Sequence, residues 1–290
     1  MERDNKVLDE LIALLKLEKI EETVFRGESQ DLGFGNIFGG QVLGQSLSAA
    51  SQTVSDDKPV HSFHGYFMRP GHPEKAITYE VDCIRDGRSF TTRRVVAIQD
   101  ERAIFSMSAS FHINEKGFDH QSDMPEVPGP EGIESDLAFA RKLQDRIPEP
   151  IRGKLTCDRP IEIRQINPVD PFAPDKKAPS KHSWFRATGK MPDDPALHKY
   201  LLAYSSDFGL MTTSLYPHGH TLWEPAMKIA SLDHAMWFHR DFRMDEWLLY
   251  VMESPSASGG TGLNHGKIYT QDGVLVASTA QEGLIRYTSN

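Results

Sequence analysis

Three polar residues in the C-terminal part of the chain differ from their surroundings and are the first candidates for chemistry. Asp207 lies near the end of a predicted helix, and the residues around it, 204–210, are mostly apolar or small. From the helix alone, this carboxylate is expected to face solvent. A helix dipole disfavours a negative charge at the C-terminus, however, and this cost suggests a function for Asp207.

Gln281 is the second candidate, because it interrupts an otherwise apolar or small strand predicted at residues 273–287. The side chains of Gln281 and Glu282 must point to opposite faces of that strand. An unpaired buried glutamate costs more than a buried amide, which favours Gln281 as the inward residue. The reverse arrangement, with Glu282 buried, stays open. An inward amide is able to hold a water molecule.

Ser231 is the third candidate and the weakest one by itself, since serine is common on strands. It lies in a strand predicted at residues 227–238. Ser231 and Asp233 can share one face of this strand, whereas Asp233 and His234 cannot. Asp233 therefore remains a rival acid.

The sequence around these candidates occurs twice in the chain. The motif around His64 returns around His234, 170 positions later, and the segment ending at Ser110 returns as the segment ending at Gln281, with an offset of 171 to 172. A near-constant offset implies two similarly folded halves. Because this alignment puts Ser110 where the second half has Gln281, only the second half carries the candidate set.

The elements that would position these residues follow a similar order in each half, a helix and then a run of antiparallel strands, which is an α+β pattern. Helices are predicted at residues 7–17, 42–50, 136–143 and 194–208, and strands at 25–26, 61–68, 76–85, 90–114, 160–166, 182–188, 227–238, 246–253, 262–270 and 273–287. The block at 90–114 is divided by a hairpin turn at residues 100–102. A proline-containing segment separates the halves. The expected organisation is a domain at 1–115, a linker at 116–157 and a second domain at 158–290.

Composition narrows the class of protein. The 290-residue chain with 39% hydrophobic residues suits two domains with normal cores, and its net charge of −9 argues against a nucleic-acid partner. Cys83 and Cys157 have neither metal-ligand nor disulfide spacing, which favours a reducing compartment. No secretory segment, membrane span or C-terminal peroxisomal signal is found, so a cytoplasmic protein with no membrane partner is expected.

Other chemistries fit the sequence less well. Residues 44–48 resemble a nucleophile elbow but lack its final glycine. There is no phosphate-binding loop, and no carboxylate or cysteine completes a metal site with His61 and His64. We therefore expect neither a metal nor a cofactor.

The chain resembles the acyl-CoA thioesterase II family, bacterial double-hotdog enzymes related to peroxisomal acyl-CoA thioesterases. The likeness runs nearly end to end, and its most specific blocks are FGGQV (38–42), HSFH (61–64), FMRPG (67–71), RDGRSF (85–90), DHAMWFHR (233–240) and YTQDGVLVAS (269–278). The resemblance implies a tandem hotdog fold, in which each half is a long helix wrapped by a curved antiparallel sheet. It also implies a tendency to form homotetramers.

The resemblance assigns the active residues to Asp207, Ser231 and Gln281, with threonine replacing the serine in some relatives. It implies hydrolysis of fatty acyl-CoA by a water molecule that these residues hold, without a covalent intermediate. Asp207 would act as general base with an ordinary pKa of about 4. Backbone N–H groups, at a helix start, would stabilise the oxyanion, but the sequence does not identify them.

Five arginines are candidates for the CoA phosphates, although each is more simply explained as a surface or ion-pair residue: Arg69, Arg88, Arg93, Arg240 and Arg243. Two other functions stay open. A hotdog enoyl-CoA hydratase would use an Asp–His pair, Asp233 with His234 or His64. A non-catalytic acyl-CoA-binding protein would bind its ligand stoichiometrically and release no thiol.

Overall fold

The computed structural model describes residues 5–33 and 35–288; the outermost residues of the two termini, which bear on the targeting signals considered above, lie outside this description. The first half contains α1 (Lys6–Leu15), β1 (Glu18–Glu21), β2 (Val24–Gly27), α2 (Gly39–Ser51), β3 (Val60–Phe67), β4 (Ile77–Asp86), β5 (Phe90–Gln99) and β6 (Arg102–His112).

Three short helices follow, α3 (Asp136–Lys142), η1 (Gln144–Arg146) and α4 (Glu149–Thr156). The second half contains β7 (Ile161–Ile166), β8 (Ser180–Ala187), α5 (Pro195–Ser206), η2 (Met211–His218), β9 (Met227–Ser231), β10 (Asp233–Phe238), β11 (Leu248–Ser258), β12 (Thr261–Thr270) and β13 (Leu275–Tyr287).

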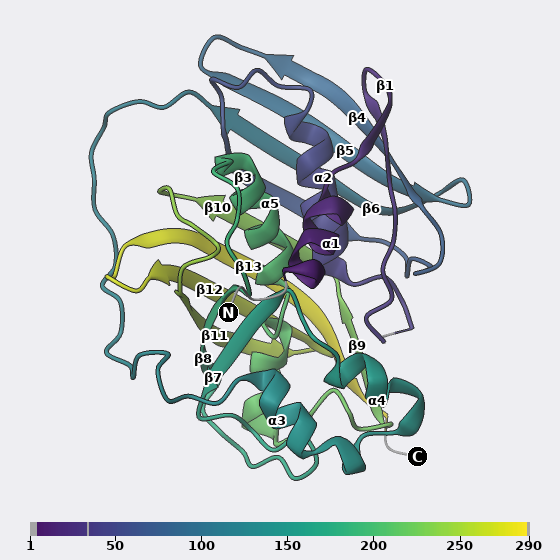
Figure 1. Cartoon of the computed structure of the whole chain (residues 1–290), viewed down its shortest axis with the longest axis vertical. Coiled ribbons are helices and arrows are strands. Elements are labelled where there is room, and N and C mark those ends of the chain that lie inside the picture. Colours follow the sequence, from purple (N-terminus) through teal and green to yellow (C-terminus); the bar gives the residue numbers. More distant parts are fainter. Residues whose placement is uncertain (1–4, 34, 289–290) are drawn as a thin grey trace.

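The strands form one antiparallel sheet that runs through both halves (Figure 1). Their order is β1-β2-β4-β5-β6-β3-β10-β13-β12-β11-β8-β7, and β9 also pairs with β13. The halves join where β3 pairs with β10, with Phe63 opposite Met236. The long helices α2 and α5 lie on the same side of this continuous sheet.

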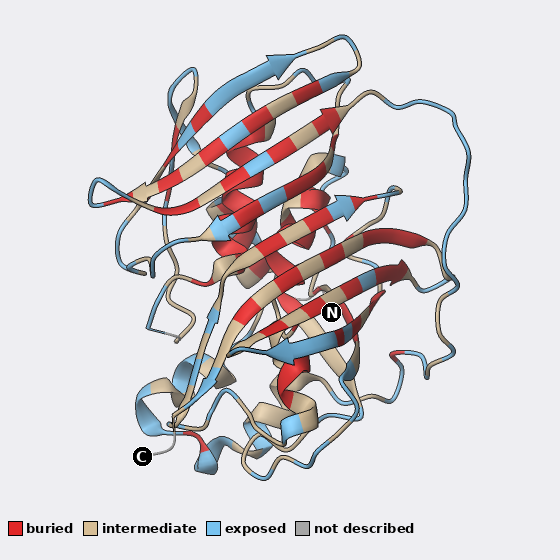
Figure 2. Ribbon diagram, turned by 180° about the vertical axis from the view of Figure 1, so that it is seen from behind, coloured by how far each residue is buried: buried red, intermediate tan, exposed pale blue. Residues whose placement is uncertain are grey.

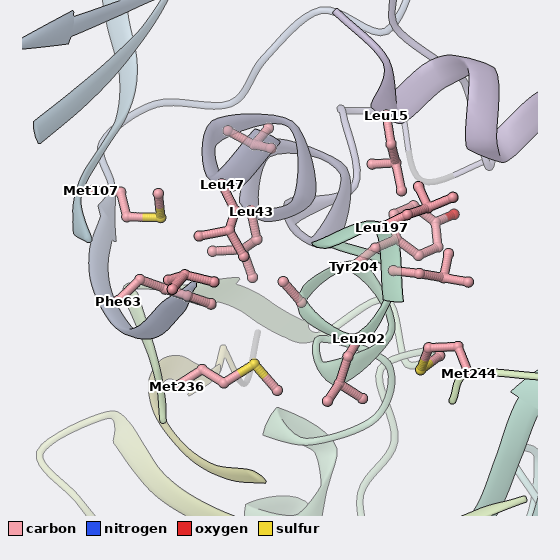
Figure 3. Close-up of a cluster of buried hydrophobic side chains, with 14 of the residues drawn as sticks. Leu15, Leu43, Leu47, Phe63, Met107, Leu197, Leu202, Tyr204, Met236 and Met244 are labelled. Atoms are coloured by element: carbon pink, nitrogen blue, oxygen red, sulfur yellow. The ribbon is translucent and has the colours of Figure 1, made fainter. Parts of the chain in front are cut away.

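The helices α2 and α5 pack closely and in opposite directions. A Cβ atom at Gly40 would lie 2.2 Å from the backbone oxygen of Tyr204, and one at Gly44 would lie 3.0 Å from that of Tyr200. Glycine at these two positions allows the helix backbones to approach each other. The core between helices and sheet contains the apolar side chains in Figure 3, among them Leu43, Leu47, Phe63, Met107, Leu202 and Met236.

Burial alternates along the strands, as Figure 2 shows for the outer side of the sheet. On β6 the buried residue is Ala109 and Ser110 is only partly covered, whereas on β13 the buried residue is Gln281. His64 is exposed and His234 is buried. The alignment of Ser110 with Gln281, and of His64 with His234, is therefore wrong by one residue, because a shift of one position reverses the face of a strand.

Most helices and strands form close to the predicted positions, but several elements differ from the prediction. The strand expected at 227–238 is broken at Leu232, whose N–H donates to the backbone oxygen of Glu282 at 2.9 Å. The strand β1 was not predicted, since all four of its residues are exposed and show no apolar alternation. The helix α4 was also missed.

The segment expected to be a linker packs against the second half. Met124 and Ile133 lie against a small apolar cluster that contains Trp184 and Tyr269. The indole N–H of Trp184 also donates to the backbone oxygen of Pro128 at 2.8 Å. This segment therefore covers part of the second half while it connects the two.

Candidate active site

The three candidate residues meet at one point of the second half. The amide Nε2 of Gln281 donates to Oδ1 of Asp207 at 2.7 Å and to Oγ of Ser231 at 3.2 Å. Asp207 is the C-cap of α5, Ser231 ends β9, and Gln281 lies within β13. One amide therefore connects an acid and a hydroxyl that come from three different elements.

The interruption between β9 and β10 at Leu232 sets the positions of Ser231 and Gln281. Asp233 stabilises this break, because its Oδ1 accepts a hydrogen bond of 2.6 Å from the backbone N–H of Glu282. Gln281 is fully buried and Glu282 is partly exposed, which confirms the predicted inward orientation of Gln281. Asp233, the rival acid, is thus occupied with the backbone of β13.

Asp207 is buried, with 7% of its side chain exposed. Burial raises the pKa of its carboxyl group, because desolvation disfavours the charged form. Hydrogen bonds from Gln281 and from the backbone N–H of Gly40 act in the opposite direction but are the smaller contributions. The ordinary pKa expected from the sequence is therefore wrong, because burial raises the pKa of the Asp207 carboxyl group above its usual value.

The first half of the chain forms one side of the site. A Cβ atom at Gly39 would lie 2.7 Å from Oδ2 of Asp207 and 3.0 Å from the ring of Phe67. The ring of Phe38 stacks on that of Phe208, with centroids 4.4 Å apart. The carboxylate is therefore close to the N-terminus of α2 and to aromatic side chains from both halves.

His234 is a further buried polar residue at the site. Its Nδ1 lies 4.0 Å from Oδ1 of Asp207, and its Nε2 lies 3.0 Å from Oγ of Ser206. Burial lowers the pKa of His234 to about 3, so its imidazole is neutral near pH 7. The carboxylate beside His234 is thus Asp207, and not the Asp233 proposed for the hydratase alternative.

Arg93, one of the five phosphate candidates, is buried and makes internal hydrogen bonds. Its guanidinium donates to Oγ1 of Thr53 at 2.8 Å and to Oδ1 of Asp86 at 2.7 Å. It also donates to three backbone oxygen atoms. Because these bonds hold the guanidinium of Arg93 inside the first half, Arg93 is not available to the CoA phosphates, contrary to the prediction.

The other four candidates are exposed or partly exposed: Arg69, Arg88, Arg240 and Arg243. Arg240 is paired with Asp119, and Arg243 with Asp193 and Asp245. Ion pairs at the surface are weak, so a phosphate group can compete for these guanidinium groups.

The sequence did not predict that His234 and the start of α2 lie beside Asp207. His234 was a candidate only for the hydratase alternative and as part of the repeated motif. Both features lie in blocks typical of the family, residues 233–240 and 38–42. Within the residues described here, no group of three or more His, Cys, Asp or Glu side chains is arranged to hold a metal ion. The same part of the chain contains no helix that is long and apolar enough to cross a bilayer.

The fold is that of a double-hotdog protein. A protein of unknown function with a hot dog fold from Alicyclobacillus acidocaldarius matches with a TM-score of 0.77 at 19% identity, over 97% of this chain and 99% of that one. An acyl-CoA thioesterase II from Mycobacterium marinum matches with a TM-score of 0.78 at 40% identity, over 96% of this chain and 99% of that one. The predicted α+β tandem hotdog fold is therefore confirmed.

Sequence comparison then defines the family. The profile described as acyl-CoA thioesterase matches residues 151–284, and that of the acyl-CoA thioesterase N-terminal domain matches residues 29–112. Acyl-CoA thioesterase 2 of Haemophilus influenzae is 45% identical over 97% of this chain and 99% of its own length. Human acyl-coenzyme A thioesterase 8 is 39% identical over 94% of this chain and 88% of its own length. The chain belongs to the acyl-CoA thioesterase family.

Proposed function

We propose that the protein hydrolyses fatty acyl-CoA to a free fatty acid and CoA, with a water molecule as the nucleophile. Family membership supports the thioester as substrate. The observation that carries the mechanism is the pair of hydrogen bonds from Gln281 Nε2 to Asp207 and Ser231, at 2.7 Å and 3.2 Å. These two bonds support a mechanism in which the carboxylate of Asp207 and the hydroxyl group of Ser231 act on the same water molecule.

In the proposed reaction, Asp207 takes one proton from the water while the water oxygen bonds to the thioester carbonyl carbon. This step produces a tetrahedral oxyanion and a neutral Asp207 carboxyl group. Collapse of the oxyanion re-forms the carbonyl and breaks the carbon–sulfur bond. The leaving sulfur of CoA receives the proton from Asp207, so the residue is regenerated and no covalent intermediate forms.

Gln281 and Ser231 orient the reacting groups. The two hydrogens of the Gln281 amide are used by Asp207 and Ser231, so the hydroxyl of Ser231 accepts one bond and keeps its own proton to donate to the water. The first turn of α2 lies beside Asp207. The N–H of Gly40 donates to that carboxylate, and the N–H of Gln41 donates to the backbone oxygen of Phe38. This leaves the N–H of Gly39 as the donor that would stabilise the oxyanion. Loss of one such donor typically costs about 2.7–4 kcal/mol.

The test is a free-thiol release assay on acyl-CoA esters from acetyl to palmitoyl, with wild type and the Asp207→Asn variant. We expect wild type to release CoA with a preference for one range of chain lengths, and Asp207→Asn to be at least about a hundredfold slower. A wild-type rate in the folded variant would refute Asp207 as the base. Hydration of crotonyl-CoA without thiol release would support the hydratase, and stoichiometric binding without product would support the sensor.

We also propose that Arg69, Arg88, Arg240 and Arg243 include the ligands of the CoA phosphates. Replacing the relevant arginine with alanine should raise the KM for the CoA ester but not for the matching pantetheine ester, which lacks the nucleotide part. An equal effect on both esters would dismiss that arginine. Arg93→Ala is a useful comparison, because its bonds inside the first half predict a loss of stability.

The assembly, compartment and domain limits are further parts of the proposal. Both ends of the sheet, β1 and β7, are edge strands, which favours association with other copies, and we propose a cytoplasmic homotetramer. Cys83 and Cys157 are exposed free thiols, which fits a reducing compartment. Light scattering would measure the assembly, and limited proteolysis would test a linker at residues 116–157.

A further inference from the structure

The hydrogen bonds of Ser206 determine which nitrogen of His234 carries the proton. The Ser206 hydroxyl lies 2.9 Å from the backbone oxygen of Ala203, which can only accept, so the serine proton is used there. Nε2 of His234 lies 3.0 Å from the same hydroxyl oxygen. This contact is a hydrogen bond only if His234 donates it. The neutral imidazole therefore has its proton on Nε2 and a free lone pair on Nδ1.

The other ring nitrogen of His234, Nδ1, lies beside the carboxylate of Asp207. His234 is fully buried, and within the described part of the chain its Nδ1 has no hydrogen-bond partner. Its nearest charged neighbour is Oδ1 of Asp207, at 4.0 Å, which is also an acceptor. A buried acceptor without a donor is costly, so this position requires a donor from outside the protein.

The spacing of the two acceptors fits a single water molecule. If a water oxygen lies about 2.8 Å from both Nδ1 and Oδ1, which is a normal hydrogen-bond length, the angle at that oxygen is about 90°. This angle is close to the one between the two O–H bonds of water. One water molecule can thus donate to His234 and to Asp207 at the same time.

We propose that His234 is a further catalytic residue, whose Nδ1 accepts one hydrogen of the hydrolytic water while Asp207 accepts the other. The inference rests on the proposed thioester hydrolysis and deepens it. With both hydrogens held and a third bond accepted from the Ser231 hydroxyl, the water has one lone pair left to attack the carbonyl carbon.

The proton balance of this step leaves His234 neutral throughout. The proton on the side of Asp207 moves to that carboxylate during attack and then to the leaving sulfur. The hydrogen on the side of His234 stays on the oxygen, which becomes the hydroxyl group of the product acid. A neutral imidazole, with a pKa lowered to about 3 by burial, suits an acceptor that orients the water without removing its proton.

Two substitutions separate this role from a structural one. In His234→Asn the amide oxygen can replace Nδ1 as acceptor, whereas in His234→Gln the longer side chain reaches the position of Nε2 and can keep the bond to Ser206. Both variants lose the ring that stacks on Phe63. We expect kcat for thiol release to be at least about tenfold higher in His234→Asn than in His234→Gln, with similar KM. Equal values, or a faster His234→Gln, would overturn the proposal.

A third variant keeps the imidazole and serves if these two do not fold. Ser206→Ala removes the acceptor that fixes the proton on Nε2, so the proton can move to Nδ1, and kcat should fall severalfold without a change in KM. Ser205→Ala is the matched control, because its buried hydroxyl has no partner among the described residues, and it should keep the wild-type kcat. An unchanged kcat in Ser206→Ala would overturn the proposal.

The Asp207→Asn variant, measured in the same assay, distinguishes a failure of the role proposed for His234 from a failure of the proposed hydrolysis mechanism. If Asp207→Asn is inactive but His234→Gln has the wild-type kcat, only the role of His234 fails. If Asp207→Asn has the wild-type kcat, the proposed hydrolysis mechanism fails first.

Discussion

The carboxylate of Asp207, at the end of α5 in the second half, accepts a hydrogen bond from the backbone N–H of Gly40, in the first turn of α2 in the first half. The N-terminus of a helix carries a partial positive charge, so α2 partly offsets the cost of burying this acid. The second half supplies the acid, hydroxyl and amide, and the first half holds the acid in place. In the proposed mechanism, both halves therefore contribute to one site.

Gly39→Ala tests this contact between the halves. The added methyl group would lie 2.7 Å from Oδ2 of Asp207, so the carboxylate or α2 must move. Misplacing a reacting group by about 1 Å costs roughly a hundredfold, and we expect kcat for thiol release to fall by at least about tenfold. Gly153→Ala in α4 is the control, because a Cβ there meets nothing within 4 Å. Equal kcat values in the two variants would contradict the role of this contact.

Gln281→Glu tests the amide that connects the acid and the hydroxyl. The substitution replaces the donor at 2.7 Å from Asp207 by an oxygen, and two buried carboxyl groups at this distance must share a proton. We expect kcat at pH 8 to fall at least about a hundredfold, with a smaller loss at pH 6, where the introduced carboxyl group can be protonated and donate. Glu282→Gln, on the other face of β13, should stay within about twofold of wild type. A loss that does not depend on pH would argue against this explanation.

Ser231 should tolerate threonine but not alanine. Threonine keeps the hydroxyl and suits a strand, so we expect Ser231→Thr to retain kcat within about threefold. Ser231→Ala removes the donor to the water and should lower kcat about tenfold, which is the size of one neutral hydrogen bond. Comparable rates for Ser231→Ala and wild type in the thiol assay would exclude the hydroxyl from the mechanism.

The raised pKa of Asp207 predicts a dependence of stability on pH. Its folded-state pKa lies above its unfolded value of about 3.9, so the folded protein binds this proton more tightly. The stability from this proton is full below the unfolded pKa and is lost as pH rises through the folded pKa. Asp207→Asn has no such group, so its Tm minus that of wild type should increase from pH 4.5 to pH 8. A constant or decreasing difference would contradict the burial of a charged Asp207.

Local patterns predicted much of this fold. The strand β6 alternates apolar and small polar residues, β11 begins with a continuous apolar run, and the repeat indicated two halves. The inward side of Gln281 followed from the cost of burying Glu282, which is a local comparison. The residue-by-residue alignment of the two halves was predicted one position off. It matched Ser110 to Gln281, whereas Ala109 is the inward residue of β6. A one-residue irregularity leaves little trace in the sequence but reverses the exposed face.

Several features of the site depend on contacts between distant parts of the chain, so they could not be predicted from the sequence. The pKa of Asp207 depends on burial by the first half, and the bond from Gly40 joins residues far apart in the chain. The role inferred for His234 depends on Ser206, which lies on another element. Arg93 was a reasonable phosphate candidate by type, but its partners Thr53 and Asp86 are known only from the fold.

The central claim is that water, and not a protein side chain, attacks the thioester. Single-turnover hydrolysis in oxygen-18 water, with enzyme in excess over acyl-CoA, tests this claim most directly. Direct attack predicts that the fatty acid from the first turnover contains one labelled oxygen and that the peptide with Asp207 contains none. Attack by Asp207 itself would form an anhydride, and hydrolysis at the aspartyl carbonyl would transfer the label to Asp207. Unlabelled fatty acid together with labelled Asp207 in mass spectrometry would contradict the account.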